Sequence, residues 1–364
     1  MAGYYVHIPF CRQACRYCDY YFTVSLKYKE ELVDSIVKEI KNKKKYFEKQ
    51  EFKTLYFGGG TPSVLNEKDI KRIITEIRTH YNFVSQPEIT FEANPDDLNP
   101  TYLKMLRSEG INRLSIGIQS FHDKDLNLMR RSHNAIQAID SIKNAQDAEI
   151  SNLNIDLIYG IPGMSFMDWQ ENLEISFKQN VTHISAYHLS FEPGTVFDHW
   201  RKKKKIIPIE EEESLEQFKY LIKKTAKEMF LHYEISNFAK EGYLSEHNKN
   251  YWNGIPFLGI GPSAHSYDGR ARSWNISSIK QYIDKTQNGS FNYTENETLS
   301  TTDRYNEYIL TSLRTMWGID LNEISQEFGI NYVKYTEEIA ADLFRKNLLE
   351  KKEQKIFITP NGIF

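Results

Sequence analysis

The chain has 364 residues, of which 40% are hydrophobic, 13% aromatic and 26% charged. This length predicts one large domain with a small appendage, and the composition supplies enough apolar side chain for a substantial core, which excludes a disordered chain. The formal net charge of -3 provides no overall attraction to nucleic acid or to an anionic membrane. Because the chain has neither a basic leader nor eighteen consecutive apolar residues, we expect a cytoplasmic protein.

Short β-rich runs alternate with helical stretches from the amino terminus onward, which is typical of βα units around a parallel sheet. Between the first two runs, Leu32, Ile36 and Ile40 recur at helical spacing with charges on the opposite face. The sequence therefore predicts an α/β fold. Its six expected strands are Tyr4 to Ile8, Thr54 to Phe57, Glu88 to Glu92, Arg113 to Ile118, Leu153 to Ile158 and His183 to Leu189.

Polar or unusual residues stand at the ends of these runs, where the chemistry of α/β barrels collects. The second run leads into Gly58 to Pro62, the third ends at Glu92, the fourth leads to Gln119 and the fifth carries Asp156. Burying even a neutral polar group without a partner costs roughly 2–7 kcal/mol, and a carboxylate costs more. The partners could be a polar ligand or the neighbouring residues themselves.

The only cysteines, Cys11, Cys15 and Cys18, fall within eight residues. An odd number in a chain without an export signal argues against disulfide bonds and favours a set of metal ligands. Three thiolates on one loop can bind three irons of a 4Fe-4S cubane and leave the fourth iron open to a small molecule. The alternative is a structural zinc site with His7 as fourth ligand, which the rigid Pro9 between His7 and Cys11 disfavours.

Cys-x3-Cys-x2-Cys with an aromatic residue, here Tyr17, before the last cysteine resembles the signature of the radical S-adenosylmethionine (SAM) superfamily. Within it, the chain resembles the branch that contains oxygen-independent coproporphyrinogen III oxidase (HemN) and the heme chaperone HemW. The similar segments span nearly the whole chain and are Tyr5 to Asp19, Gly58 to Ser63, Glu92 to Pro95, Ile116 to Phe121, Arg130 to His133, Asn154 to Gly163 and Leu189 to Thr195. The resemblance implies a partial TIM-type barrel of about six βα units, in agreement with the six runs.

The resemblance also implies a set of cofactor-binding residues. Cys11, Cys15 and Cys18 would hold the 4Fe-4S cluster, and SAM would chelate the remaining iron. The implied SAM contacts are Tyr5, Gly59, Gly60, Thr61, Glu92, Gln119, Arg131 and Asp156. Glycines without side chains let the backbone approach a ligand, and an arginine can form a charge-assisted pair with the SAM carboxylate.

Two features separate the oxidase from the chaperone. The oxidase carries a further cysteine two places after the third cluster cysteine, where this chain has Tyr20. It also has an N-terminal extension, whereas this chain begins ten residues before Cys11. Both features favour the chaperone.

The segment from His247 to Trp252 is similar to the HNxxYW heme-associated motif of HemW. The resemblance implies that His247 ligates heme iron while Tyr251 and Trp252 cover a porphyrin face. A second, weaker candidate ligand is His265, in a glycine- and proline-rich segment that predicts an ordered loop. Taken alone, a single histidine in a loop would be interpreted as structural.

From about Thr301 the pattern becomes helical and resembles the family's small winged-helix-like C-terminal domain. The expected elements are helices Tyr305 to Thr315, Leu321 to Phe328 and Tyr335 to Lys346, and a strand Lys355 to Ile358. Residues 301–364 hold eight Lys or Arg against ten Asp or Glu, a net of -2, so we expect no nucleic-acid partner. The opposite charge runs at 201–205 and 210–213 are interpreted as a solvated linker and a helix start.

We therefore expect three parts. Residues 1–200 would form the radical SAM partial barrel, 201–300 a barrel extension and linker with the heme motif, and 301–364 the small C-terminal domain.

The leading hypothesis is a heme chaperone that carries a 4Fe-4S cluster, SAM and heme, and transfers the heme to an acceptor protein. Respiratory proteins are candidate acceptors, through which the chain would contact a membrane transiently, and a flavodoxin or ferredoxin is the kind of electron donor expected. The alternatives are an oxygen-independent coproporphyrinogen III oxidase, which decarboxylates two propionates, and a zinc-stabilised scaffold. Whether the chain is an enzyme stays open at this point.

Overall fold

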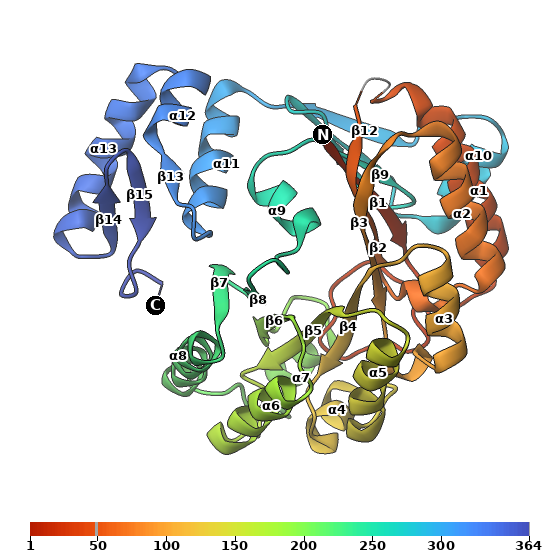
Figure 1. The fold of residues 1–364 in the computed structure, drawn as a ribbon, viewed down its shortest axis with the longest axis horizontal. Helices are drawn as coiled ribbons and strands as arrows, with labels where there is room; N and C mark the ends of the chain where they lie inside the picture. Colours follow the sequence, from red (N-terminus) through yellow and green to blue (C-terminus); the bar gives the residue numbers. More distant parts are fainter. Residues whose placement is uncertain (48–49, 364) are drawn as a thin grey trace.

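A twelve-stranded, mostly parallel sheet curves around an interior and carries helices on its outer side (Figure 1). The structure, a computed structural model, describes residues 1–47 and 50–363. Phe364, the last residue of the expected C-terminal domain, lies outside this description. Over the described residues the strand order is β12-β11-β10-β9-β1-β2-β3-β4-β5-β6-β8-β7, which leaves two edges and no closed barrel.

The six expected parallel strands form the centre of the sheet and confirm the predicted partial barrel. They are β1 (Ala2–Ile8), β2 (Phe52–Gly59), β3 (Phe83–Ala93), β4 (Arg113–Gln119), β5 (Asn152–Tyr159) and β6 (His183–His188). The helices that connect them are α1 (Lys29–Asn42), α2 (Glu67–His80), α3 (Pro100–Ser108), α4 (Asp123–Met129), α5 (Ala135–Asp147) and α6 (Phe166–Lys178). Capping boxes at Asn66, Asn134 and Ser165 fix the starts of α2, α5 and α6.

The strands divide their side chains between an apolar outer face and a polar interior. On β1, Tyr4, Val6 and Ile8 belong to the hydrophobic core, whereas Tyr5 and His7 line the interior pocket. Successive side chains of a strand point to opposite faces, so this alternation follows from the sequence order alone. The polar side chains on the inner faces of β2 to β6 include Tyr56, Glu92, Arg113, Ser115, Asn154, Asp156 and Ser185.

After β6 the chain extends both edges of the sheet. The sequence predicted a barrel extension at 201–300 but did not identify its strands. The added elements are α7 (Val196–Lys202), α8 (Glu211–Lys227), β7 (Phe230–Glu234), β8 (Asn237–Lys240), α9 (Glu246–Trp252), β9 (Phe257–Ile260), β10 (His265–Tyr267), β11 (Ala271–Asn275), α10 (Ile279–Gln287) and β12 (Thr294–Thr298). Of these, β9 pairs in parallel with β1, so it is a seventh parallel strand.

The sequence predicted an ordered loop for the glycine- and proline-rich segment at 254–266. The segment is ordered, but residues Phe257–Ile260 within it form strand β9. A side chain on Gly259 would place its Cβ 2.0 Å from the carbonyl oxygen of His265. Glycine is therefore required there for the close approach of two backbone segments inside the sheet. Among the described residues, no helix is both long and apolar enough to cross a membrane.

The C-terminal part has its own hydrophobic core, which includes Tyr305, Leu321, Ile324 and Ile356. Its elements are α11 (Thr301–Leu313), β13 (Ile319–Asp320), α12 (Leu321–Glu327), α13 (Ile330–Arg345), β14 (Leu349–Lys352) and β15 (Lys355–Ile358). The expected three helices and strand are present, and a small three-stranded sheet completes the winged-helix-like arrangement. β13 has only two residues and β14 is mostly charged, so neither shows a strand pattern. The predicted limits of the three parts stay a prediction.

A buried carboxylate ties helix α1 to the extended edge of the sheet. Glu39 is 0% exposed and accepts hydrogen bonds from Tyr282 Oη at 2.5 Å, Asn275 Nδ2 at 2.7 Å and the Gly261 amide at 2.8 Å. Lys43 pairs with it at 2.7 Å. Glu39 thus joins α1, α10 and β11, which lie far apart in the sequence.

Replacing Glu39 by alanine should destabilise the protein by about 3–5 kcal/mol, because Lys43 and three other donors lose their common acceptor. Chemical unfolding followed by circular dichroism measures this change. Glu30→Ala, at an exposed position of the same helix, should change the free energy of unfolding by less than about 0.5 kcal/mol. Equal effects of the two substitutions would show that the network does not hold the extended edge.

Candidate cofactor site

The interior of the partial barrel contains a pocket of about 840 Å³. All of the residues that the resemblance implies for the cluster and SAM line it. They are Cys11, Cys15 and Cys18 with Tyr5, Gly59, Gly60, Thr61, Glu92, Gln119, Arg131 and Asp156. The sequence therefore predicted which residues meet in space, although their roles are not tested by this arrangement.

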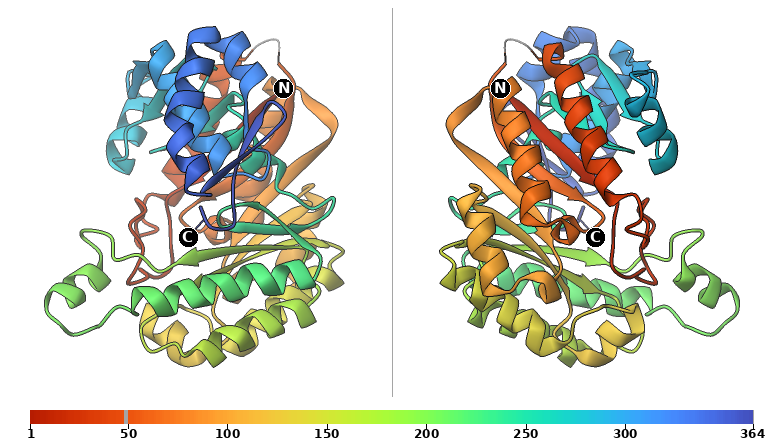
Figure 2. Two further views of the ribbon diagram at one scale, coloured as in Figure 1. Left: turned by 90° about the vertical axis from the view of Figure 1, so that its left-hand side faces the viewer. Right: turned by 90° about the vertical axis from the view of Figure 1, so that its right-hand side faces the viewer.

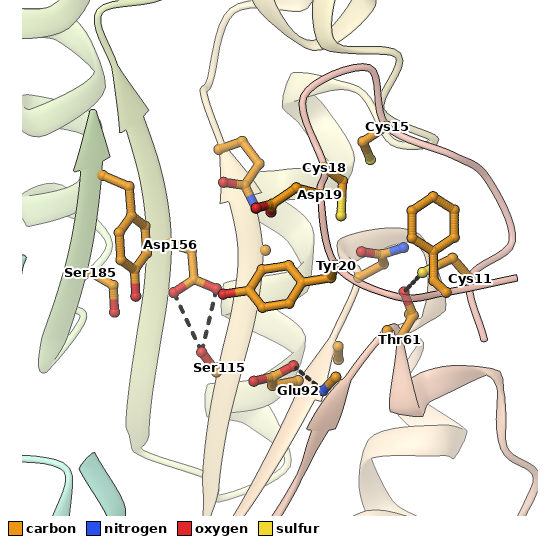
Figure 3. Close-up of a pocket in the computed structure, with 18 of the residues that line it drawn as sticks. Cys11, Cys15, Cys18, Asp19, Tyr20, Thr61, Glu92, Ser115, Asp156 and Ser185 are labelled. Carbon is orange, nitrogen blue, oxygen red and sulfur yellow. Dashed lines mark hydrogen bonds between the residues drawn. The ribbon is translucent and has the colours of Figure 1, made fainter. Parts of the chain in front are cut away.

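The three cysteines lie on one loop after β1, and their sulfurs face the pocket (Figure 3). This loop closes on itself through two backbone hydrogen bonds, from the Cys11 amide to the Thr23 carbonyl and from the Thr23 amide to the Pro9 carbonyl. Thr61 Oγ1 donates to Cys11 Sγ at 3.3 Å. Burial raises the pKa of Cys18 to about 11, so metal binding there must displace a proton from the thiol.

The thiols do not converge on a mononuclear site. Among the residues that the structure describes, no three His, Cys, Asp or Glu side chains are placed to hold one metal ion. His7, the fourth ligand of the zinc alternative, instead forms a hydrogen bond through Nδ1 with Tyr5 Oη at 2.9 Å. A tetrahedral zinc site needs all four ligands at one ion, whereas a cubane takes each cysteine on a different iron.

The glycines after β2 are required by the packing of the protein itself. Gly59 has φ +107°, and a Cβ there would lie 2.5 Å from the imidazole of His7. A Cβ on Gly60 would lie 2.7 Å from the Phe10 carbonyl oxygen. The two glycines therefore bring the backbone of β2 against the start of the cysteine loop, and they leave the loop's inner side open to a ligand.

Glu92 at the end of β3 accepts a hydrogen bond from Tyr56 Oη at 2.7 Å. It also accepts one from the Gly59 amide at 3.2 Å, the dashed line at Glu92 in Figure 3. Removal from bulk water raises the pKa of Glu92 to about 7, and the negative charge of Asp156 adds to this shift. Near neutral pH this carboxyl group can thus exist in either protonation state, and a cation beside it would favour the ionised form.

Asp156 on β5 lies across the pocket from the cysteine loop (Figure 3). It accepts a hydrogen bond from Asn154 Nδ2 at 2.8 Å and weaker ones from Ser115 Oγ at 3.4 and 3.5 Å. Burial raises its pKa, and the hydrogen bond from Asn154 opposes that effect. These amide and hydroxyl donors are the partners that a carboxylate inside a strand requires.

Arg131 and Gln119 lie at the carboxyl end of β4. Arg131 donates to Asn94 Oδ1 and the Gly117 carbonyl, both at 2.8 Å, and to Cys15 Sγ at 3.3 Å. Its Nε is buried without a hydrogen-bond partner. Gln119 has φ +67°, a conformation that a non-glycine residue rarely adopts and that is common at ligand sites.

The HNxxYW segment forms helix α9, which lies against the inner side of the sheet. Glu88 of β3 accepts hydrogen bonds from the Glu246 and His247 amides, each at 3.0 Å, so a strand carboxylate caps the helix start. His247 is 2% exposed, and its Nδ1 lies 2.8 Å from Thr54 Oγ1 while its Nε2 lies 3.0 Å from Tyr251 Oη. Burial lowers its pKa to about 3, so the imidazole is neutral at physiological pH.

The residues implied for heme do not all meet. His247, Tyr251 and His265 line the pocket. Trp252 does not line it, and its ring instead lies 5.5 Å from the guanidinium carbon of Arg314. Tyr251 is 37% exposed, and its ring packs edge-on against the rings of His247 and Phe257.

Sequence reasoning missed several polar residues of the pocket, among them Tyr56, Ser115, Asn154 and Ser185. The signal that could have found them is period-two alternation. Tyr56 stands two residues before Gly58, and Asn154 two residues before Asp156, so each shares a strand face with a residue that the resemblance had indicated.

Comparisons with known proteins agree with this geometry. Residues 5–175 match the Radical SAM superfamily and residues 299–364 match the HemN C-terminal domain. The heme chaperone HemW of Bacillus subtilis is 31% identical, over 100% of this chain and 96% of that protein. The heme chaperone HemW of Buchnera aphidicola subsp. Schizaphis graminum is 34% identical, over 96% and 92%.

The fold is similar to that of the Escherichia coli coproporphyrinogen III oxidase HemN, a radical SAM enzyme. The TM-score is 0.86 at 25% identity, and the superposition covers 99% of this chain and 87% of that chain. The resemblance inferred from the sequence is thus confirmed: the chain belongs to the HemW family of radical SAM proteins.

Proposed function

We propose that this chain is a heme chaperone, which binds heme and transfers it to an acceptor protein, and which holds a 4Fe-4S cluster and SAM in its barrel. The full-length similarity to HemW heme chaperones is the observation that carries this proposal. The position two places after Cys18 supports it, because Tyr20 stands there instead of the cysteine of the oxidases. Free thiols and a cluster suit a reducing compartment, so a cytoplasmic location is part of the proposal.

The residues of the pocket fit the two cofactors. Three free thiols on one loop provide the ligands of a cluster with one open iron. Arg131 has an unpartnered Nε beside this loop, which suits the carboxylate of SAM, and Glu92 suits a positively charged group. When both are bound, the cluster and SAM supply one-electron reductive chemistry. The chain contributes orientation and a polar, enclosed surface.

For heme, the proposed ligand is His247, with Tyr251 against the porphyrin face and His265 as a second candidate. A neutral imidazole is the form that binds iron, and His247 is neutral. Before Nε2 of His247 could bind iron, it would have to give up its hydrogen bond with the Tyr251 hydroxyl. This requires a movement of α9 or of the Tyr251 side chain. Trp252 would join the site only after a larger rearrangement.

The second candidate function is oxygen-independent coproporphyrinogen III oxidase, which the similarity to HemN favours. A polar pocket that could hold porphyrin carboxylates is compatible with it. We rank it second because Tyr20 stands where the oxidases carry a cysteine.

Anaerobic reconstitution with iron and sulfide should give a brown protein with about four irons and four sulfides per chain. Cys15→Ala should lower both contents, because the cubane would lose one of its three ligands. His7→Ala, which removes the fourth ligand of the zinc alternative, should leave both contents unchanged. A colourless protein that binds one zinc ion, and loses it in both variants, would contradict the cluster.

SAM binding should strengthen by about tenfold between pH 6 and pH 8, because Glu92 ionises with a pKa of about 7 and SAM is cationic. Below pH 7 the carboxyl is protonated and its attraction for SAM is lost. Isothermal titration calorimetry on the cluster-loaded chain measures this dependence. Glu92→Gln should bind SAM weakly, with the same affinity at pH 6 and pH 8. If that variant still binds SAM more tightly at pH 8, as the unmodified chain should, the role of Glu92 is refuted.

Heme added to the cluster-loaded chain should give a Soret band that shifts or weakens in His247→Ala. His80→Ala provides the matched control, because His80 pairs with Glu76 on α2, outside the pocket. If His265→Ala changes the band and His247→Ala does not, the second candidate is the ligand. A band unaffected by either substitution would place heme elsewhere.

A further inference from the structure

Arg113, the first residue of β4, carries a buried charge without hydrogen bonds. The residue is 1% exposed, and neither Nε nor Nη2 of its guanidinium has a hydrogen-bond partner. Among the described residues, the one carboxylate within ion-pair distance is that of Glu88, whose Oε2 lies 4.0 Å from Arg113 Nε. This separation is too long for a hydrogen bond. Because a buried charged donor is costly to leave unpaired, the position requires an acceptor.

Glu88 does not serve as that acceptor, because its oxygens are engaged elsewhere. They accept hydrogen bonds from the Glu246 and His247 amides at the start of α9, each at 3.0 Å. One carboxylate thus contacts the backbone of His247 with one oxygen and approaches Arg113 with the other. The guanidinium therefore lies near the start of the helix that carries the proposed heme ligand, and both Arg113 and His247 line the pocket.

A second unpartnered polar group stands beside Arg113 in the sheet. Thr90 of β3 is the register partner of Arg113 on β4, and its hydroxyl is buried without a hydrogen-bond partner. Register partners on adjacent strands point to the same face, so the hydroxyl and the guanidinium share one side of the sheet. Water could satisfy both as hydrogen-bond partners, but only an anion would also compensate the charge of Arg113.

Arg113 lies at a different level of the barrel from the residues implied for SAM. Glu92 and Gln119 stand at the carboxyl ends of their strands, whereas Arg113 stands at the amino end of β4. Figure 2 shows these two ends, with the cysteine loop (red) at one and the start of β3 (orange) at the other. The six residues from Arg113 to Gln119 span up to about 20 Å of strand. Arg131, proposed for the SAM carboxylate, donates to the Gly117 carbonyl near the carboxyl end.

We propose that Arg113, assisted by the Thr90 hydroxyl, binds a propionate carboxylate of the heme that the chain carries. The inference rests on the proposed function and adds to it a residue that recognises the porphyrin by its side chains as well as by its iron. Nε and Nη2, the two unpartnered nitrogens, lie on the same edge of the guanidinium. That edge presents two parallel N–H groups, the arrangement that binds a carboxylate in a bidentate manner.

The acidic residues of the pocket are compatible with a carboxylate at Arg113. Burial raises the pKa of Glu92 and of Asp156, and the positive charge of Arg113 opposes this effect on both. Neither carboxyl forms a hydrogen bond with Arg113, because Glu92 accepts one from Tyr56 and Asp156 accepts one from Asn154. SAM is cationic, so its binding beside Glu92 would offset the negative charge there. The guanidinium is then left to the propionate.

The test compares heme with heme dimethyl ester, whose two propionates are uncharged, in absorbance titrations of the cluster-loaded chain. The unmodified chain should bind the ester about tenfold more weakly than heme, because the ester forms no charge-assisted pair with the guanidinium. Arg113→Gln should bind heme about tenfold more weakly and should not distinguish it from the ester. Arg113→Lys, which keeps the charge without the fork, should lie between the two. The control is Arg78→Gln, at an exposed position of α2, which should behave like the unmodified chain.

Equal affinities of the unmodified chain for heme and its ester would overturn the proposal, and this comparison does not require any variant to fold. An Arg113→Gln chain that binds both more weakly but still prefers heme would also overturn it, because Arg113 would then only support the fold. A loss of SAM affinity in Arg113→Gln with heme affinity unchanged would assign the position to the SAM carboxylate and overturn it as well. An unmodified chain that binds neither heme nor the ester would instead fail the proposed function, so the two failures are distinguishable.

Discussion

The site depends on one constraint: a strand that borders a polar pocket must alternate polar inner residues with apolar outer ones. Strands β2 to β5 satisfy it by pairing inner groups with one another, as in the contacts of Tyr56 with Glu92 and of Asn154 with Asp156. Each inner carboxylate thereby keeps a hydrogen-bond donor even without a ligand. The carboxylates of the wall are therefore satisfied without a ligand, whereas Arg131 Nε is buried there without a partner.

The same constraint links the two ends of the pocket. Glu88 and Glu92 stand on the inner face of β3, four residues apart, and serve different parts of the molecule. Glu92 contacts the glycine segment beside the cysteine loop, whereas Glu88 caps α9 and so fixes the position of His247. A single strand therefore supports both the proposed cluster and SAM region and the proposed heme ligand, so the two proposed sites share a wall.

Features that depend on local sequence pattern could be predicted from the sequence. Features that depend on contacts between residues far apart in the chain could not. The six parallel strands follow from short β-rich runs, and the meeting of Glu92, Gln119 and Asp156 follows from their places at strand ends. The burial of His247 could not be predicted, because Thr54 and Glu88 lie more than 150 residues away in the chain. Strand β9 was not predicted because its glycine, Gly259, is typical of a turn. The structure shows that glycine is required there because the backbone of His265 lies too close for a side chain.

The most direct test of the account is a paired measurement on the chain loaded with cluster and SAM under anaerobic conditions. One sample is also loaded with heme and mixed with apomyoglobin as a heme acceptor, and a second, heme-free sample is given coproporphyrinogen III and a reductant. The account predicts that heme appears in myoglobin and that no carbon dioxide is released from the porphyrinogen. Release of carbon dioxide, with heme retained by the chain, would contradict the account and identify an oxidase.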